Sequence, residues 1–227
     1  MIDNRRFFNL SAWGYDFITR QEIWRDQIRK TLSHAGDLIS LDRILDLGCG
    51  PGISSFVLGE ALSDVEIIGV DVSDAMIRRA RRHRERSYGH LENVSFRRAD
   101  VYDLHLDQGS FDLVVGHSFL YLLPDRGEAL CAIHRVLRPG GRLVLMEPNA
   151  EGNLLSAVGR SGDLHWLRSP WTATRFATSM VLWRIVSRSQ GQLRADKLGR
   201  LFGEAGFNDC DVNLTLGGLG LHATGRK

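Results

Sequence analysis

Short apolar runs alternate with helical patterns through the middle of the chain, and no other feature constrains the fold as strongly. We predict strands at residues 43–47, 65–70, 94–98, 111–116 and 142–147, with helices between them at 53–62, 74–87 and 124–137. Each predicted strand is almost continuously apolar, so helices must cover both faces of the sheet. The pattern therefore predicts an α/β fold with a mostly parallel sheet.

The segments on either side of this core complete a single domain of 227 residues. Helical apolar spacing is present at 16–35 and again at 149–192, where no strand is evident. A helix at 193–205 and strands near 207–214 and 219–224 follow. We therefore divide the domain into an N-terminal helical segment (1–40), a core (41–148), a helical cap insertion (149–192) and a C-terminal helix with strands (193–227).

The overall composition narrows the classes of function. The formal net charge is only +2, which argues against a protein whose main partner is nucleic acid. The cysteines Cys49, Cys131 and Cys210 are few, odd in number and far apart, so we predict neither a disulfide framework nor a metal site. The charged N-terminus has no apolar run behind it. We expect no signal peptide, no membrane span and a cytoplasmic location.

A glycine-rich loop, Gly48-Cys49-Gly50-Pro51-Gly52, follows the first predicted strand. In a doubly wound sheet, ligands bind beyond the carboxyl ends of the strands, near the point where the strand order reverses. A dinucleotide fingerprint would place a third glycine where this chain has Ile53, and the phosphate-binding Gly-Lys-Ser/Thr sequence is absent. Asp46 precedes the loop, and its carboxylate would repel a pyrophosphate but attract an ammonium group. S-adenosylmethionine has such an ammonium and no phosphate.

Two more acids stand at the ends of the next two predicted strands. Asp71 can accept both ribose hydroxyls, and Asp100 can accept a hydrogen bond from the adenine amino group while the Val101 amide donates to a ring nitrogen. The alternatives are a helix N-cap for Asp71 and a turn-forming role for Asp100. For Cys49 we favour a small packed residue over a nucleophile.

Motifs along residues 40–150 resemble those of the class I S-adenosylmethionine-dependent methyltransferases. The matching runs are Ile44 to Gly52, Gly69 to Ser73, Ala99 to Val101, Ser110 to Val115 and Val136 to Gly141. The resemblance implies a Rossmann-like seven-stranded sheet with a reversed last strand, and S-adenosylhomocysteine as the product. It also makes 41–148 the cofactor-binding core. A weaker similarity links the chain to quinone-biosynthesis C-methyltransferases and bacterial phospholipid N-methyltransferases.

The resemblance assigns cofactor-binding residues along this core. It implies that 48–52 face the methionine part of the cofactor and that 117–119 border the transferable methyl group. The predicted cofactor set is Asp46, Gly48, Cys49, Gly50, Gly52, Asp71, Val72, Met76, Asp100, Val101, His117 and Ser118. His117 is also our candidate catalytic base, with a role limited to bordering the cofactor as the alternative.

The insertion is the best indication of the methyl acceptor. It holds three of the five tryptophans, among them Trp183, and an apolar face with interspersed arginines. We interpret it as a cap over an apolar or aromatic acceptor. The alternatives are a helix that contacts a membrane surface or a second copy of the chain, and an ordinary helix packed on the sheet. Tyr15, Phe119, Tyr121 and Trp183 are the candidate acceptor contacts. The predicted function is methyl transfer to a small molecule such as a quinone, lipid or secondary metabolite.

Several alternatives and partners remain open from the sequence. A non-catalytic S-adenosylmethionine-binding subunit would have a degraded loop, and an NAD(P)-dependent oxidoreductase would have a glycine near 53 and no acid at 46. The arginine run at 78–86 is interpreted as a solvated helix face, with anionic lipid or nucleic acid as the alternative. We expect no nucleic-acid partner, leave peripheral membrane contact open, and predict a monomer or homodimer.

Overall fold

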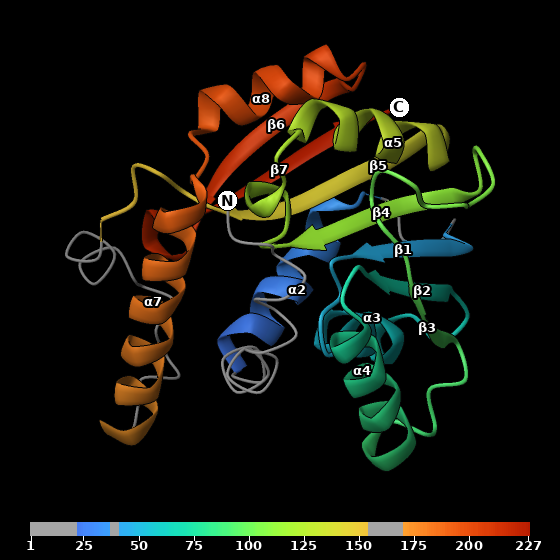
Figure 1. Cartoon of the computed structure of the whole chain (residues 1–227), viewed down its shortest axis with the longest axis horizontal. Helices are drawn as coiled ribbons and strands as arrows, with labels where there is room; N and C mark the ends of the chain where they lie inside the picture. Colours follow the sequence, from blue (N-terminus) through green and yellow to red (C-terminus); the bar gives the residue numbers. More distant parts are fainter. Residues whose placement is uncertain (1–21, 37–40, 154–169) are drawn as a thin grey trace.

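The computed structural model describes residues 22–36, 41–153 and 170–227, and its centre is a seven-stranded sheet (Figure 1). The strands are β1 (Arg43–Leu47), β2 (Glu66–Asp71), β3 (Val94–Arg98), β4 (Phe111–His117), β5 (Leu137–Pro148), β6 (Asn208–Thr215) and β7 (Gly220–Arg226). Their order is β3-β2-β1-β4-β5-β7-β6. β7 pairs antiparallel with both β5 and β6, and the other four pairs of neighbours are parallel. The predicted seven-stranded sheet with a reversed last strand is confirmed.

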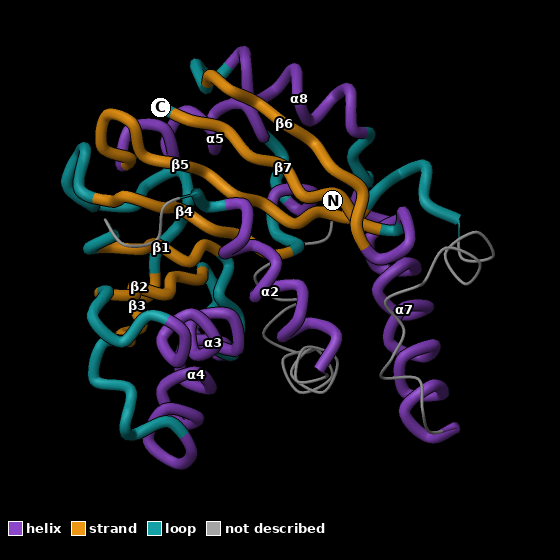
Figure 2. Tube along the Cα trace, turned by 180° about the vertical axis from the view of Figure 1, so that it is seen from behind, coloured by secondary structure: helices purple, strands orange, loops and turns teal. Residues whose placement is uncertain are grey.

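Helices cover both faces of the sheet, as the apolar strands require. They are α2 (Glu22–His34), α3 (Ile53–Ala61), α4 (Asp74–Ser87), α5 (Arg126–Val136), α7 (Pro170–Gln190) and α8 (Ala195–Glu204), with short 3₁₀ turns at Leu120–Leu122 and Leu216–Gly218. Figure 2 shows α5 and α8 on one side of the sheet and α2, α3 and α4 on the other. Leu45 and Leu47 belong to the core under α5 and α8, whereas Ile44 belongs to the core under α2 to α4. The same alternation turns Asp46 toward α3.

Most observed boundaries lie within two residues of the predicted ones, and the largest difference is in β5. The strand predicted at 142–147 is longer in the structure. β5 starts at Leu137 and includes the Pro139-Gly140-Gly141 turn. In the pairing of β4 with β5, Phe111 lies opposite Leu137 and Leu113 lies opposite Arg142. The register therefore shifts between these two pairs, and the turn forms a bulge in β5. Gly140 has a φ of +78°, which such a bulge accommodates. The helix predicted over 16–35 is described from Glu22 to His34, and residues 1–21 lie outside the described part.

The longest described element of the insertion is the helix α7. Its Met180 and Trp183 are buried in a small cluster that includes Trp24 of α2 and Met146 of β5. Val181 and Ile185 on the other side of the helix are 44% and 61% exposed. Among the described residues, no helix is both long enough and apolar enough to cross a membrane.

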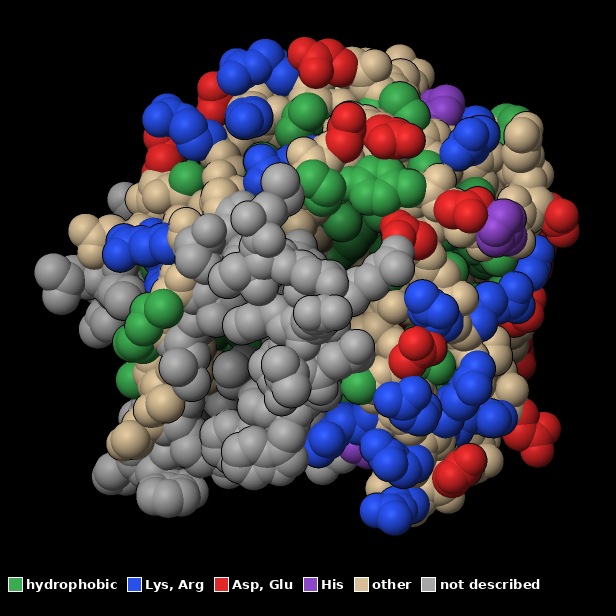
Figure 3. Space-filling model, viewed as in Figure 1, with side chains coloured by type: hydrophobic (Ala, Val, Ile, Leu, Met, Phe, Trp, Pro, Cys, Tyr) green, Lys and Arg blue, Asp and Glu red, His purple; other side chains and the backbone are tan. Residues whose placement is uncertain are grey.

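The arginine run lies on α4, where Figure 3 shows Lys and Arg side chains gathered. Met76, Ile77 and Ala80 face the core, while Arg78, Arg81, Arg82 and Arg86 are exposed. The exposure agrees with the predicted solvated face of this helix.

Candidate functional site

The glycine loop between β1 and α3 adopts a backbone that side chains disfavour. Gly48, Gly50 and Gly52 have φ values of +64°, +52° and +93°, in the left-handed region that costs other residues roughly 1–2 kcal/mol. A Cβ added to Gly48 would lie 2.7 Å from the Cβ of Phe119. The Cys49 amide donates to the Val70 carbonyl of β2 at 3.0 Å. The loop is therefore tied to the end of β2 and closely packed on the segment after β4.

Asp46 is fully buried and only half satisfied. Its Oδ2 accepts hydrogen bonds from Ser54 Oγ at 2.5 Å and Ser55 Oγ at 2.6 Å, in the first turn of α3. Its Oδ1 is buried and has no hydrogen-bond partner among the described residues. Burial raises the pKa of Asp46 to about 6, against the lowering effect of the two serines. A buried carboxylate oxygen without a donor points to a cationic or donor ligand at this atom.

Asp71 links the glycine loop to the end of β2. Its Oδ2 accepts from the Gly50 amide at 3.0 Å, and its Oδ1 accepts from the Ser73 amide at 2.8 Å. Burial raises the pKa of the Asp71 carboxyl above its usual value. The N-cap of α4 is Ser73, whose hydroxyl accepts from the Met76 amide, so the alternative of a helix cap for Asp71 is wrong.

Asp100 shapes the turn after β3. Its Oδ1 accepts from the Tyr102 amide at 3.3 Å, and its carbonyl accepts from the Asp103 amide at 3.0 Å. The turn-forming alternative therefore applies to Asp100, and its contact with adenine stays a prediction. The Val101 side chain is buried in the core beside this turn, and the Met76 side chain is buried under α4. Val72 lies between Asp71 and the Ser73 cap, and is half-buried.

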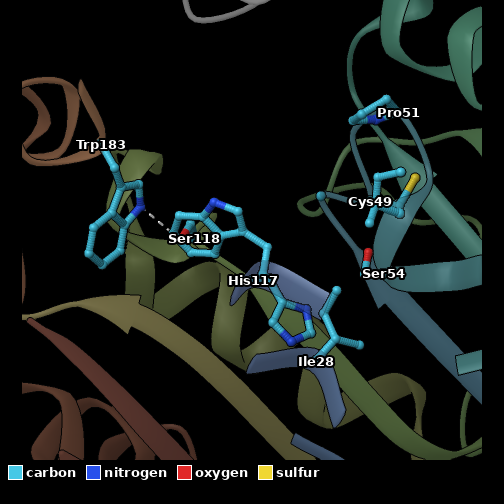
Figure 4. A pocket seen from close by; sticks show the side chains of 10 residues that line it. Ile28, Cys49, Pro51, Ser54, His117, Ser118 and Trp183 are labelled. Atoms are coloured by element: carbon cyan, nitrogen blue, oxygen red, sulfur yellow. Dashed lines mark hydrogen bonds between the residues drawn. The ribbon is translucent and has the colours of Figure 1, made fainter. Parts of the chain in front are cut away.

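A pocket lies beside the glycine loop and joins four parts of the chain (Figure 4). These parts are the loop with the start of α3, the end of β4, helix α2 and helix α7. The lining residues are, in the same order, Gly48, Cys49, Pro51, Ile53 and Ser54; His117 and Ser118; Trp24 and Ile28; and Trp183. Strand β1 has β2 on one side and β4 on the other, so the pocket lies at the reversal of strand order where ligands bind. The sequence predicted Gly48, Cys49, His117, Ser118 and Trp183 here.

Two indole rings form one wall of this pocket. Trp24 and Trp183 meet edge to face, with ring centroids 5.3 Å apart and an interplanar angle of 71°. Trp183 Nε1 donates to Ser118 Oγ at 3.1 Å, the bond drawn in Figure 4. Ser118 itself has a φ of +57°, which is uncommon outside glycine and frequent at functional sites. Helix α7 is thus fastened to the end of β4.

His117 at the end of β4 is a neutral ring. Burial, with a further contribution from His222, lowers its pKa to about 3. Its Nε2 lies 2.8 Å from Thr31 Oγ1 of α2, while Nδ1 is buried and has no hydrogen-bond partner among the described residues. A general base works best with a pKa near the operating pH. The low pKa of His117 therefore favours bordering and orienting over proton abstraction.

Glu147 organises the segment after β4, and the sequence analysis missed it. Its Oε1 accepts from the amides of Phe119 at 3.1 Å and Leu120 at 2.9 Å, and its Oε2 from that of Tyr121 at 3.1 Å. Burial raises the pKa of Glu147 to about 7. The sequence did offer one indication of this role, because Glu147 is an acid at the carboxyl end of the strand next to β4. The fully buried carboxylate fixes the backbone next to Ser118.

Two further predicted acceptor contacts, Phe119 and Tyr121, are not among the residues that line the pocket. Phe119 is buried, and a Cβ added to Gly48 would lie 2.7 Å from its Cβ, so it packs against the glycine loop. Tyr121 is buried in the core. Tyr15 lies outside the described residues. The sequence did not predict Trp24 and Ile28 as pocket residues, because their spacing is that of the ordinary apolar face of a helix.

Comparison with known proteins agrees with this geometry. A family described as a methyltransferase domain matches residues 39–204, which is more than half of the chain. The chain belongs to this family, the S-adenosylmethionine-dependent methyltransferases. The alignment includes the glycine loop, all three strand-end acids and the pocket-lining segment of α7.

Individual relatives differ in length from this methyltransferase. It is 31% identical over 212 residues to the demethylmenaquinone methyltransferase of Lactococcus lactis, covering 89% of this chain and 81% of that one. It is 42% identical over 106 residues to an uncharacterised 37.1 kDa transposon protein of Streptomyces fradiae, covering 46% of this chain but 30% of that protein.

A solved structure confirms the fold. The phosphoethanolamine N-methyltransferase 2 of Haemonchus contortus, in complex with S-adenosyl-L-methionine, superposes with a TM-score of 0.68 at 19% identity. The match covers 95% of this chain and 46% of that one.

Proposed function

We propose that this methyltransferase transfers a methyl group to a small apolar or aromatic acceptor bound against Trp24 and Trp183. The observation that carries the proposal is the pocket itself, which joins the glycine loop to an apolar aromatic wall. Ile28 and Ile53 extend the apolar lining, and His117 and Ser118 add a few polar atoms between them. Such a mixture, mostly apolar with few fixed polar groups, is typical of small-molecule sites.

The residues around the glycine loop fit the cofactor. Asp46 Oδ1, buried and unpartnered among the described residues, would accept a hydrogen bond from the ammonium group, and the positive-φ glycines let the methionine part approach the backbone. Asp71 would accept from the ribose hydroxyls and Asp100 from the adenine amino group. When bound, the cofactor supplies a methyl group already activated on a sulfonium. The protein is then left with positioning the acceptor and excluding water.

The acceptor class is supported by the site and by one relative. Edge-to-face indoles bind flat apolar rings well, and Trp183 is held in place by Ser118. The Lactococcus lactis relative carries the name of a demethylmenaquinone methyltransferase. We propose a ring-bearing acceptor of the quinone or phenol type.

We also propose a cytoplasmic location, which agrees with the free cysteines Cys49, Cys131 and Cys210.

A methyl-transfer assay tests the acceptor class. Labelled S-adenosylmethionine is incubated with the full chain and either hydroxylated aromatic rings or aliphatic carboxylic acids of similar size. Trp183→Ala removes one of the two indoles of the aromatic wall, and Trp183→Phe keeps a ring but not the bond to Ser118. We expect label in the aromatic acceptors, a KM for the acceptor at least tenfold higher in Trp183→Ala, and a smaller rise in Trp183→Phe. Equal transfer to the carboxylic acids, or an unchanged KM in Trp183→Ala, would overturn the proposed acceptor class.

A further inference from the structure

The pocket-lining His117 belongs to a row of three side chains, two of them histidines, that runs across three strands. His117 of β4 pairs in register with Met146 of β5, which pairs with His222 of β7, so the three side chains lie on one face of the sheet. Helix α2 covers this row. Thr31 Oγ1 lies 2.8 Å from His117 Nε2, and the rings of His34 and His222 have centroids 5.0 Å apart.

The single hydroxyl proton of Thr31 decides which nitrogen of His117 is protonated. Thr31 Oγ1 lies 3.1 Å from the carbonyl oxygen of Gln27, one helical turn earlier, and a carbonyl oxygen can only accept. The hydroxyl therefore donates to Gln27 and offers a lone pair to His117. His117 Nε2 then donates the ring proton to Thr31, which leaves Nδ1 as a bare lone pair.

The opposite tautomer would leave a worse defect. If Thr31 donated to Nε2, the ring proton would sit on Nδ1, which is buried without an acceptor among the described residues. An unsatisfied buried donor is strongly disfavoured, and the carbonyl of Gln27 would also lose its bond from the Thr31 hydroxyl. The neighbours of the row, His222 and His34, supply no anion that would favour a doubly protonated ring.

We infer that Thr31 is a positioning residue that presents the Nδ1 lone pair of His117 to a methyl acceptor carrying an O–H or N–H group. The inference rests on the proposed function, because it assumes that the acceptor occupies the pocket beside His117, Ser118 and Trp183 (Figure 4). Nδ1 is the one ring nitrogen not already bonded to Thr31, and it can only accept. A phenolic or hydroquinone hydroxyl matches this requirement, whereas a fully oxidised quinone ring does not.

Nitrogen NMR of the histidine rings tests the tautomer without activity. The full chain is labelled with ¹⁵N-histidine, and the His117 signals are assigned by their loss in His117→Gln. We expect wild-type His117 to show a protonated Nε2 and a bare Nδ1. Thr31→Val, which keeps the side-chain shape and removes the hydroxyl, should shift the ring toward the other tautomer, while Thr31→Ser should keep the wild-type pattern. A protonated Nδ1 in the wild type, or an unchanged spectrum in Thr31→Val, would overturn the inference.

Kinetics separate this inference from the proposed function. We expect Thr31→Val to lower kcat/KM for a hydroxylated acceptor by about tenfold, as for one lost buried hydrogen bond, and to leave the Kd of S-adenosylhomocysteine unchanged. Thr31→Ser should restore the rate. If His117→Gln transfers methyl groups as fast as the wild type, the acceptor does not contact His117, even with the tautomer as predicted. Since the wild-type spectrum decides the tautomer once His117 is assigned, poor folding of a Thr31 variant does not prevent the test.

Discussion

Cofactor affinity should depend on pH through Asp46. The carboxylate is fully buried beneath the glycine loop, and its pKa is raised to about 6. Its unpartnered Oδ1 attracts an ammonium group only when the carboxyl is ionised. The α-amino group of the ligand stays protonated between pH 5 and 7, because its ordinary pKa lies at about 7.7–8.0. Lowering the pH across this range therefore removes the charge on Asp46 and not the charge on the ligand.

The size of the effect follows from the pKa. With a pKa of about 6, roughly nine-tenths of Asp46 is ionised at pH 7 and about one-tenth at pH 5. The protonation of Asp46 alone should therefore raise the Kd of S-adenosylhomocysteine about tenfold from pH 7 to pH 5, equivalent to about 1.4 kcal/mol. Binding of the ammonium should in turn lower the pKa of Asp46 in the complex.

Calorimetric titration at pH 5, 6 and 7 measures this dependence. Methylthioadenosine is the matched control ligand, since it has the adenosine and sulfur but no amino-acid end, and so cannot contact Asp46 through an ammonium. Its Kd should carry only the contribution of Asp71, whose pKa is also raised. The Asp46→Asn variant should bind S-adenosylhomocysteine weakly and show the same pH dependence as methylthioadenosine. An equal pH dependence for both ligands in the wild type would refute the contact between Asp46 and the ammonium.

Two further predictions concern stability. Gly48→Ala should destabilise the fold by about 2–4 kcal/mol in urea unfolding, because of the left-handed φ and the close contact with Phe119. The control is Gly203→Ala in α8, where an added Cβ meets nothing within 4 Å. It should be neutral or stabilising in the same experiment. Glu147 has its pKa raised from 4.5 to about 7, so the folded state holds this proton more tightly than the unfolded chain. The free energy of unfolding should lose about 2 kcal/mol from this group between pH 5 and 7. Glu147→Gln should lack that loss, and a pH profile identical to wild type would disprove the buried titration.

Elements governed by local patterns could be predicted from the sequence. β1, α4 and β3 begin and end at the predicted residues. The apolar run of β1, the alternating apolar residues Val94 and Phe96 of β3 and the Ser73 cap of α4 mark them in the sequence. The glycine loop was also located, since its composition permits few other backbones. Asp46 was recognised by its position in front of that loop, where its charge bears directly on the choice of ligand.

Features that depend on register and tertiary packing could not be predicted. Glu147 bonds the amides after β4 only because β5 pairs beside that strand, and pairing is not visible in one sequence. Trp24 and Ile28 line the pocket because α2 lies across the strand ends, although their spacing shows only that one face of a helix is apolar. The bond between Thr31 and His117 joins residues 86 positions apart. The three-dimensional arrangement was needed to find it.

A crystal structure of the full chain with S-adenosylhomocysteine tests the central claim most directly. We predict that the ligand ammonium lies within hydrogen-bond distance of Asp46 Oδ1. The ribose hydroxyls should contact Asp71, and the adenine amino group should contact Asp100, with the sulfur directed toward the pocket lined by His117 and Trp183. A ligand bound with its amino-acid end away from Asp46, or with its ribose away from Asp71, would contradict the assignment of the strand-end acids.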